Sequence, residues 1–365
     1  GTPVKGDWSF IQVGNPSDIG TAKLDTCRVK WGGYVSTGDY ASVYTYRGTT
    51  TLRGCDISGS KNYGIGTEST GSIAVQTSNI FQCDWPVGWF GQGTLTFDAA
   101  SNFTGNTHNG INVRFSTSTG TMYLDTAAVP YVFPSFTVNG IMEIASGNDL
   151  KFAQYYGLTI NGSLVAKAAV AKQIRFTGYA DDNVGGDTNA DGTATTVAQS
   201  YWAGITFNDA SVDTVSIMKR CRVTWAGYYI RGGISLQNAS PTIDSCSMAN
   251  NYYGVMMQGV SNPVFSNNDI GTSAVVPIAL SFSASPVFSN NSFSASDNQY
   301  DAIGILSETV IANSYLPIRS VTSSPNVTYL LLGTVTIPVS YTLTIQPGIV
   351  IKSYTSSHRL IIEGK

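Results

Sequence analysis

The chain is poor in charged side chains, in histidine and in long apolar runs. Lysine, arginine, aspartate and glutamate make up 12% of the 365 residues, the net charge is −3, and there are two histidines, His108 and His358. This balance provides no basic face, so we expect no nucleic-acid partner. No apolar run approaches the length that spans a bilayer, so we expect no membrane span in this part of the protein.

Cysteine is also scarce, and its pattern argues against two common uses. The chain has five cysteines, an odd number, and none of them belongs to a CxxC pair. A small disulfide scaffold normally needs an even count, and structural zinc sites use closely spaced cysteines. We therefore expect neither a disulfide scaffold nor a cysteine metal cluster.

Glycine and short β-branched segments, by contrast, are abundant. There are 38 glycines, and serine, threonine and asparagine are frequent, which suits a fold with many tight turns. Apolar residues follow no helical period. Short runs such as Thr342–Ile345 and Leu360–Ile362 are bounded by glycine or proline and are typical of strands. The sequence therefore predicts an all-β protein.

A short repeat indicates a solenoid. Each copy contains a turn, an alternating strand and a polar corner, and three copies align at sequence offsets of 22 and 23: Pro241–Met248, Pro263–Ile270 and Pro286–Phe293. This pattern predicts a right-handed parallel β-helix with coils of about 22–28 residues. The alignment places Cys246, Asn268 and Asn291 in one column, where stacked side chains should hydrogen-bond along the axis.

The cysteines recur at similar intervals. Cys27, Cys55 and Cys83 follow one another at a constant offset of 28, and Cys221 and Cys246 are related by an offset of 25. Buried cysteine packs as a small hydrophobic residue. We therefore predict that Cys27, Cys55 and Cys83 form an inward-facing ladder of free thiols on adjacent coils.

A longer repeat covers most of the chain. Residues Cys27–Tyr34 match Cys221–Tyr228 at an offset of 194, which also relates Trp8 to Trp202, and residues 144–147 match 345–348 at an offset of 201. We predict a first super-repeat over residues 1–200, truncated at its start, and a second over 201–365, truncated at its end. Together they should form one continuous solenoid, with flanking segments of the same polypeptide on both sides.

Three motifs resemble a known family. They are Leu158–Lys167 leading into Ile174–Thr177, Asp181–Gly192 followed by Trp202–Phe207, and Thr342–Lys352. Together they are similar to the right-handed parallel β-helix repeat proteins of bacterial surfaces and secreted multidomain proteins, within the pectin-lyase-like superfamily. The resemblance implies this fold and a secreted or cell-surface location. It does not select an activity, because the fold carries lyases, hydrolases, epimerases and inert stalks.

An acidic segment has the spacing of a calcium loop. Oxygen side chains alternate before Gly192, and the candidate ligands are Asp181, Asp182, Asp187, Asn189 and Asp191. Such donors can converge on one Ca²⁺ ion, and the glycine permits the sharp bend. The glutamate expected at the twelfth position is absent, because that position is Ala198. The alternative is a solvated loop rich in turn-forming residues.

One outward-facing column could carry catalysis. If each cysteine points inward, the next residue points outward, which gives the column Arg28, Asp56 and Asp84. Two stacked carboxylates would lie about 5 Å apart, near the separation in retaining glycosidases. The alternative is an Arg–Asp ladder on a solvated face. Neither histidine lies in a catalytic or metal-ligand pattern.

A cluster of large aromatic residues could bind a ligand. Trp85, Trp89 and Phe90 lie close together in the sequence, and such rings stack on sugar faces or anchor interfaces. Trp31 and Trp225 recur at equivalent positions, so we interpret them as core or corner residues of the repeat.

The sequence favours a non-catalytic stalk or adhesin-like segment of a larger bacterial surface protein, with glycans or other surface proteins as partners. One alternative is a carbohydrate-active enzyme, a lyase or glycoside hydrolase, that uses Asp56 and Asp84. Another is a carbohydrate-binding module that works through the Trp85 region.

Overall fold

The computed structural model describes residues 1–34, 40–293 and 298–363. It comprises two compact units, the first made of residues 1–153 and 171–197, the second of residues 154–170 and 198–365. All regular structure in the described residues is β-strand. None of these residues forms a helix long and apolar enough to cross a membrane.

The strands of the first unit are β1 (Ile11–Val13), β2 (Gly20–Asp25), β3 (Arg28–Lys30), β4 (Ala41–Arg53), β5 (Asp56–Ser58), β6 (Tyr63–Gln76), β7 (Asn79–Phe81), β8 (Trp85–Trp89), β9 (Leu95–Phe97), β10 (Ile111–Val113), β11 (Thr117–Ser118), β12 (Thr121–Leu124), β13 (Tyr131–Phe133), β14 (Phe136–Val138), β15 (Ile141–Ile144), β16 (Asp149–Phe152) and β19 (Ile174–Gly178).

The strands of the second unit are β17 (Gly157–Ile160), β18 (Ser163–Lys167), β20 (Gly204–Phe207), β21 (Ile217–Lys219), β22 (Cys221–Thr224), β23 (Gly232–Gln237), β24 (Thr242–Asp244), β25 (Ser247–Ala249), β26 (Tyr253–Gln258), β27 (Val264–Ser266), β28 (Asp269–Gly271), β29 (Ile278–Leu280), β30 (Val287–Ser289), β31 (Ile303–Ile305), β32 (Glu308–Thr309), β33 (Ser314–Leu316), β34 (Tyr329–Leu331), β35 (Val335–Ile337), β36 (Leu343–Ile345), β37 (Ile351–Ser353) and β38 (Leu360–Ile362).

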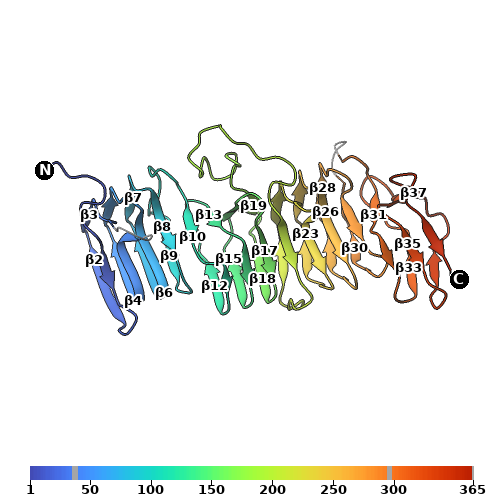
Figure 1. Cartoon of the computed structure of the whole chain (residues 1–365), viewed down its shortest axis with the longest axis horizontal. Helices are drawn as coiled ribbons and strands as arrows, with labels where there is room; N and C mark the ends of the chain where they lie inside the picture. Colours follow the sequence, from blue (N-terminus) through green and yellow to red (C-terminus); the bar gives the residue numbers. More distant parts are fainter. Residues whose placement is uncertain (35–39, 294–297, 364–365) are drawn as a thin grey trace. The chain divides into compact units, whose positions relative to one another are not determined.

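Within each unit the named strands pair in parallel with their counterparts one coil away. In the first unit β4, β6, β8 and β10 lie side by side, and β13, β16 and β19 continue the same sheet (Figure 1). In the second unit β20, β23, β26 and β29 form one side of the coil, and β21, β24, β27 and β30 form another. This topology confirms the predicted all-β parallel β-helix.

Side chains that alternate along each strand fill the interior. In β12, Met122 and Leu124 are buried and their neighbours are exposed. In β15, Met142 and Ile144 are buried and their neighbours are half-buried. Each apolar residue therefore stacks on an apolar residue of the next coil. Burial of this kind is the main favourable term in folding.

Coil lengths vary over a wider range than the sequence predicted. Val43 pairs with Ile65 at an offset of 22, whereas Tyr131 pairs with Leu150 at an offset of 19 and Ile11 with Val43 at an offset of 32. Loops at the corners absorb the difference while the strands keep their pairing.

The two units repeat the same contacts at the predicted offset of 194. The indole nitrogen of Trp8 donates to the carbonyl of Lys30 at 2.6 Å, and that of Trp202 donates to Thr224 at 2.8 Å. Trp31 and Trp225 have φ angles of 63° and 65°, which identifies both as corner residues. The division into super-repeats at residue 200 stays a prediction.

The predicted cysteine ladder of the first unit is partly wrong. Cys55 lies one coil from Cys27, as expected, because the amide of Asp56 donates to the carbonyl of Cys27. The next coil is shorter, with an offset of 23, so Ser78 rather than Cys83 follows in the column. Cys83 lies in the following corner. All five thiols are free, which confirms that part of the prediction, but Cys27 is only partly buried.

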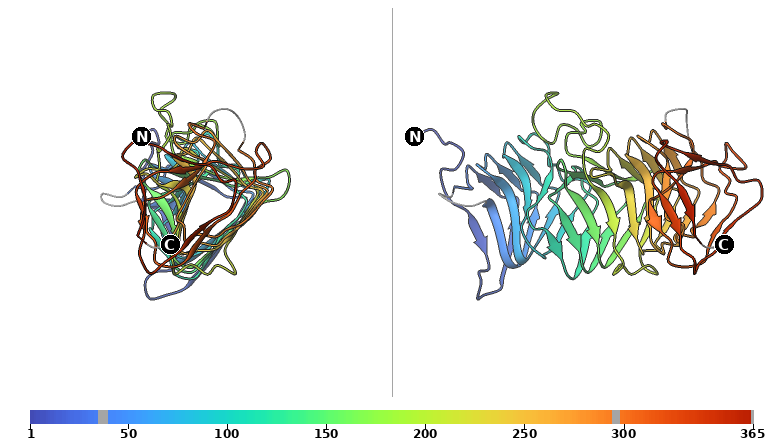
Figure 2. Two further views of the ribbon diagram at one scale, coloured as in Figure 1. Left: turned by 90° about the vertical axis from the view of Figure 1, so that its right-hand side faces the viewer. Right: turned by 45° about the vertical axis from the view of Figure 1, so that its right-hand side comes forward.

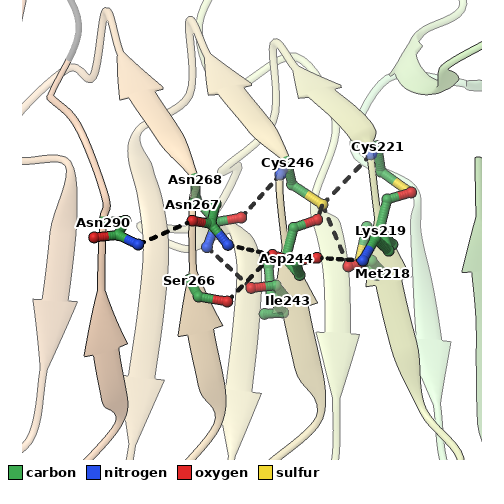
Figure 3. Close-up of polar contacts among 10 residues, drawn as sticks. All are labelled: Met218, Lys219, Cys221, Ile243, Asp244, Cys246, Ser266, Asn267, Asn268 and Asn290. Carbon is green, nitrogen blue, oxygen red and sulfur yellow. Dashed lines mark hydrogen bonds and ion pairs between the residues drawn. The ribbon is translucent and has the colours of Figure 1, made fainter. Parts of the chain in front are cut away.

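The column predicted in the second half is confirmed. The amide of Cys246 donates to Oδ1 of Asn268 at 2.9 Å (Figure 3). The amide of Asn268 donates to Oδ1 of Asn291 at 3.0 Å. Cys221 heads the column, and its amide reaches Sγ of Cys246 at 3.4 Å. Each side chain therefore accepts the backbone hydrogen bond that the bend would otherwise leave unmade.

Candidate functional site

The acidic segment is a long loop that leaves the coil after β19. Figure 1 shows it outside the strands, and Figure 2 shows it from two further sides. The chain turns at Asp181, whose amide donates to the carbonyl of Gly178, and the carbonyl of Asp181 accepts from the amide of Val184. Residues 179–203 are all described and contain no strand, so they form an excursion from the coil.

Three carboxylates converge within this loop. Asp182, Asp187 and Asp191 each place one oxygen within 4.8 Å of the others. Asp187 accepts hydrogen bonds from the amides of Asp191 and Gly192, which folds this part of the loop back onto the Asp187 side chain. Thr195 connects Asn189 to the group, because its hydroxyl accepts from Nδ2 of Asn189 and donates to Asp191.

Three oxygens of this group have no partner within the described part of the chain. Oδ1 of Asp182, Oδ1 of Asn189 and Oδ1 of Asp191 are closed off from solvent and accept no hydrogen bond. Asp181, the fifth predicted ligand, is placed differently: it is buried, and its Oδ2 accepts from the hydroxyl of Thr177 at 2.6 Å. Asp181 therefore fastens the start of the loop to β19 and is not a member of the converging group, contrary to the sequence prediction.

The loop is fastened to the first unit through Thr188. The carbonyl of Thr188 accepts from the hydroxyl of Tyr179 at 3.1 Å and lies 2.9 Å from Nδ1 of His108. The ammonium of Lys151, on β16, donates to the carbonyl of Gly186 at 2.6 Å and to the hydroxyl of Thr188 at 2.9 Å. These three side chains hold the loop backbone against the outer face of the sheet.

Burial and the concentrated negative charge both alter ionisation here. Burial lowers the pKa of Lys151 to about 8, although the nearby carboxylates of Asp182 and Asp181 oppose that shift. The pKa of Asp182 is raised, first by burial and then by the charge of Asp187, while Lys151 acts in the opposite direction. Burial and the charge of Asp187 therefore both disfavour the ionised form of Asp182.

The catalytic pair proposed from the sequence does not form. Asp56 pairs with Asn79, whose Nδ2 donates to Oδ1 of Asp56 at 3.0 Å, and Nε of Arg28 lies 3.7 Å from Oδ2 of Asp56. Asp84 lies in the next corner, 4.0 Å from Nε2 of His108. The prediction that Asp56 and Asp84 stack on each other is therefore wrong. It assumed an offset of 28 between both pairs of coils, whereas the second offset is 23.

The predicted aromatic binding loop is largely a strand. Residues Trp85–Trp89 form β8, and Trp89 points into the core, where it packs on Phe115 and Tyr131 and its indole nitrogen donates to Gly93. Trp89 is therefore not a ligand-binding residue, contrary to the prediction. The ring of Trp85 stacks on His108 with centroids 4.5 Å apart.

Phe90 covers the outer face of the same sheet. Gly66 and Gly88 are paired there, and a Cβ at either position would meet the Phe90 ring at 3.0 Å or less. Phe90 also packs edge-on against Tyr63 at 5.1 Å. This self-packed layer accounts for much of the aromatic cluster, and glycan binding by Trp85 and Phe90 stays a prediction.

A cavity that sequence reasoning missed lies on the second unit. It has a volume of about 400 Å³ and is lined by Val260, Phe282, Ile311 and Tyr315 together with Asn238 and Asn313, among others. No charged side chain is among the described residues that line it. Ile311 and Tyr315 are exposed by 73% and 56%, so apolar surface is open to a ligand there.

Comparison with known proteins supports the fold and leaves the activity open. A family model described as a right-handed beta helix region matches residues 183–329. No curated protein and no solved structure matches the chain significantly. Together with the parallel sheets, the match establishes a right-handed parallel β-helix, the architecture found in pectin-lyase-like proteins.

Proposed function

We propose that the chain is a non-catalytic extracellular stalk or adhesin-like segment of a bacterial surface protein. The observation that carries the proposal is that the same corner framework is built twice, once in each unit, at a sequence offset of 194. A duplicated framework suits a spacer, whose length grows by repetition.

The use of ionisable side chains supports a structural role. Arg175 binds Asp149 on the neighbouring coil through two short contacts, at 2.5 and 2.7 Å, and Lys219 binds Asp244 at 2.7 Å. These pairs span adjacent coils and do not assemble an acid, a base and a charge stabiliser around one substrate position, as catalysis requires.

His108 and Asp84 are the arrangement nearest to a catalytic pair. Nδ1 of His108 faces the carbonyl of Thr188, and its ring stacks on Trp85, so two of its faces are already occupied. Asp84 remains 4.0 Å away. We therefore propose that His108, with Asp84 beside it, helps to hold the loop through Thr188.

The test is product release from pectate, alginate and neutral glycans by the purified protein. We expect none. If activity appears, and Asp84→Asn or His108→Ala abolishes it while far-UV circular dichroism shows an intact fold, the enzyme alternative replaces this proposal. Asp56→Asn, which alters a structural pair, serves as the matched control.

A carbohydrate-binding role is a second candidate, favoured by the cavity of the second unit. An exposed tyrosine ring beside apolar surface and amide groups is a combination that suits a neutral sugar. A glycan array tests it: binding that Tyr315→Ala removes and Tyr123→Ala, an exposed tyrosine of the first unit, does not would support this role. An array without hits would exclude it for the glycans tested.

A further inference from the structure

We infer that the loop of residues 182–191 binds one calcium ion through Asp182, Asp187, Asn189 and Asp191. This inference concerns the first unit and is independent of whether the chain acts as a stalk. The loop supplies only oxygen donors, which calcium prefers. Among the described residues, neither cysteine nor histidine belongs to the converging group, so the site does not suit softer metals.

Unsatisfied oxygens give the strongest reason to place a cation here. Oδ1 of Asp182, Oδ1 of Asn189 and Oδ1 of Asp191 are closed off from solvent, and no described residue donates a hydrogen bond to them. Leaving a buried polar atom unpaired costs the free energy of removing it from water, and the cost is greater when the atom carries charge. Native structures rarely retain three such atoms in one loop, and coordination to a cation is one way to satisfy buried oxygens of this kind.

The spacing of the carboxylates fits one calcium ion. Calcium lies about 2.3–2.6 Å from its oxygen ligands, so two ligands on opposite sides can be about 5 Å apart. The oxygens of Asp182, Asp187 and Asp191 lie within 4.8 Å of one another. Asn189 contributes a neutral donor from the same turn, and its amide nitrogen is already engaged by Thr195.

The nearest ammonium does not occupy this position. Lys151 directs its hydrogen bonds to the carbonyl of Gly186 and the hydroxyl of Thr188, which are backbone and neutral groups of the loop. Its role is to hold the loop on the sheet, together with His108 and Tyr179. These contacts hold the loop backbone that carries the three carboxylates. The hydrogen bonds of Lys151 are made to Gly186 and Thr188 and not to the carboxylates.

Bound calcium would join the two ends of the loop. Asp182 follows directly on Asp181, which is fastened to β19, while Asp191 lies at the far end beside Gly192. Coordination by both would link Asp182 to Asp191, and we expect calcium to raise the melting temperature of the first unit.

Calorimetry on chelator-treated protein tests the inference, with calcium chloride as the titrant and magnesium chloride in a parallel titration. We expect a single calcium site, weaker magnesium binding and a higher melting temperature with calcium. Absence of both heat and a melting shift would overturn the inference, and magnesium binding as tight as calcium would overturn the assignment of the ion.

Two variants locate the site. Asp191→Asn removes one charged ligand, and Asn189→Ala removes a ligand without changing the charge. We expect each to weaken calcium binding at least tenfold. Asp209→Asn, an exposed aspartate of the second unit, is the charge-matched control and should bind as the wild type does. Wild-type affinity in both loop variants would overturn the inference, and circular dichroism establishes that each variant is folded.

Discussion

The corresponding corners of the two units use different side chains to accept the hydrogen bond of a backbone amide at the bend. In the first unit the column consists of Cys27, Cys55, Ser78 and Ser101, and in the second of Cys221, Cys246, Asn268 and Asn291. In both columns the chain bends with a positive φ just before the cysteine, for example 59° at Gly54 and 57° at Ser245.

The bend interrupts the backbone ladder, so the next amide needs another acceptor. The amide of Cys55 donates to the hydroxyl of Ser78 at 3.0 Å, whereas that of Cys246 donates to the carboxamide of Asn268 at 2.9 Å. The amide of Cys221 uses a sulfur, Sγ of Cys246. Serine, cysteine and asparagine are therefore interchangeable as acceptors at this corner.

Asparagine at this corner also donates hydrogen bonds, in addition to accepting one from the backbone. Nδ2 of Asn268 also donates to the carbonyl of Ile243 and to Oδ1 of Asn291, so one buried side chain connects three coils. Ser78 donates once, to the carbonyl of Gln76 in its own coil. The comparison indicates that the asparagine column contributes more to stability than the serine column, which mutagenesis can measure.

The largest effect is expected for Asn268→Ala. The substitution leaves the buried amide of Cys246 without an acceptor and removes both donor contacts of the carboxamide, so we expect a loss of about 3 kcal/mol or more in the free energy of unfolding. Urea unfolding measures the loss. Hydrogen exchange at the amide of Cys246 gives a local readout, and unchanged protection there would contradict the ladder.

A smaller and pH-dependent effect is expected for Asp244→Ala. Asp244 accepts from Lys219 at 2.7 Å, from Nδ2 of Asn267 at 2.7 Å and from the hydroxyl of Ser266 at 3.2 Å (Figure 3). Burial raises its pKa, but these contacts outweigh that effect and lower the pKa from 3.8 to about 2. We expect the substitution to cost about 2 kcal/mol at neutral pH.

The sign of the pH dependence follows from the lowered pKa. The stabilisation by Asp244 is fully present above about pH 4 and is lost as the pH falls toward 2, because the unfolded state takes up the proton first. The stabilities of wild type and Asp244→Ala should therefore converge in this range. An equal difference at pH 7 and pH 2 would contradict the assignment, and Asp209→Ala, at an exposed position, serves as the control.

The sequence predicted the second column because its coils have nearly constant length. The prolines at 241, 263 and 286 mark the same turn, so Cys246, Asn268 and Asn291 align without reference to a structure. In the first unit, an offset of 28 followed by one of 23 brought Ser78 into register in place of Cys83. Matching residue type across unequal coils therefore misplaced both Cys83 and Asp84.

The candidate calcium loop was predictable in part. The alternating Asp, Asn and Asp residues before Gly192 are local and visible in the sequence. The side chains that hold this loop in place are not visible in the sequence. Lys151 and His108 contact Thr188 from sequence separations of 37 and 80 residues. The burial of Trp89 was missed for a related reason: it depends on the pairing of β8 with β6 and β10.

Ser78→Ala should destabilise less than Asn268→Ala. It removes the acceptor of the Cys55 amide and one donor contact, so we expect a loss of about 1–2 kcal/mol. Urea unfolding under the conditions used for Asn268→Ala provides the comparison. A loss as large as that of Asn268→Ala would refute the proposed difference between the two columns.

The smallest effect on stability is expected for the thiols, which differ in exposure. Cys27 begins the first column and is partly exposed, while Cys55, Cys83, Cys221 and Cys246 are buried. Burial also raises the pKa of Cys83 to about 11, which keeps it protonated at neutral pH. The thiolate is the reactive form and needs access to the reagent. We therefore expect one thiol to react with a disulfide reagent in the native protein and all five after unfolding.

The variant Cys27→Ser separates this thiol from the four buried ones. It should abolish the native reaction and leave the urea midpoint unchanged, since the Sγ atom of Cys27 makes a single hydrogen bond, to the carbonyl of Asp25, that a serine hydroxyl can replace. A native reaction that persists in this variant would mean that a buried thiol becomes accessible. Incomplete thiol reaction in the unfolded protein without reductant would reveal a disulfide and contradict the structure, in which all five cysteines are free.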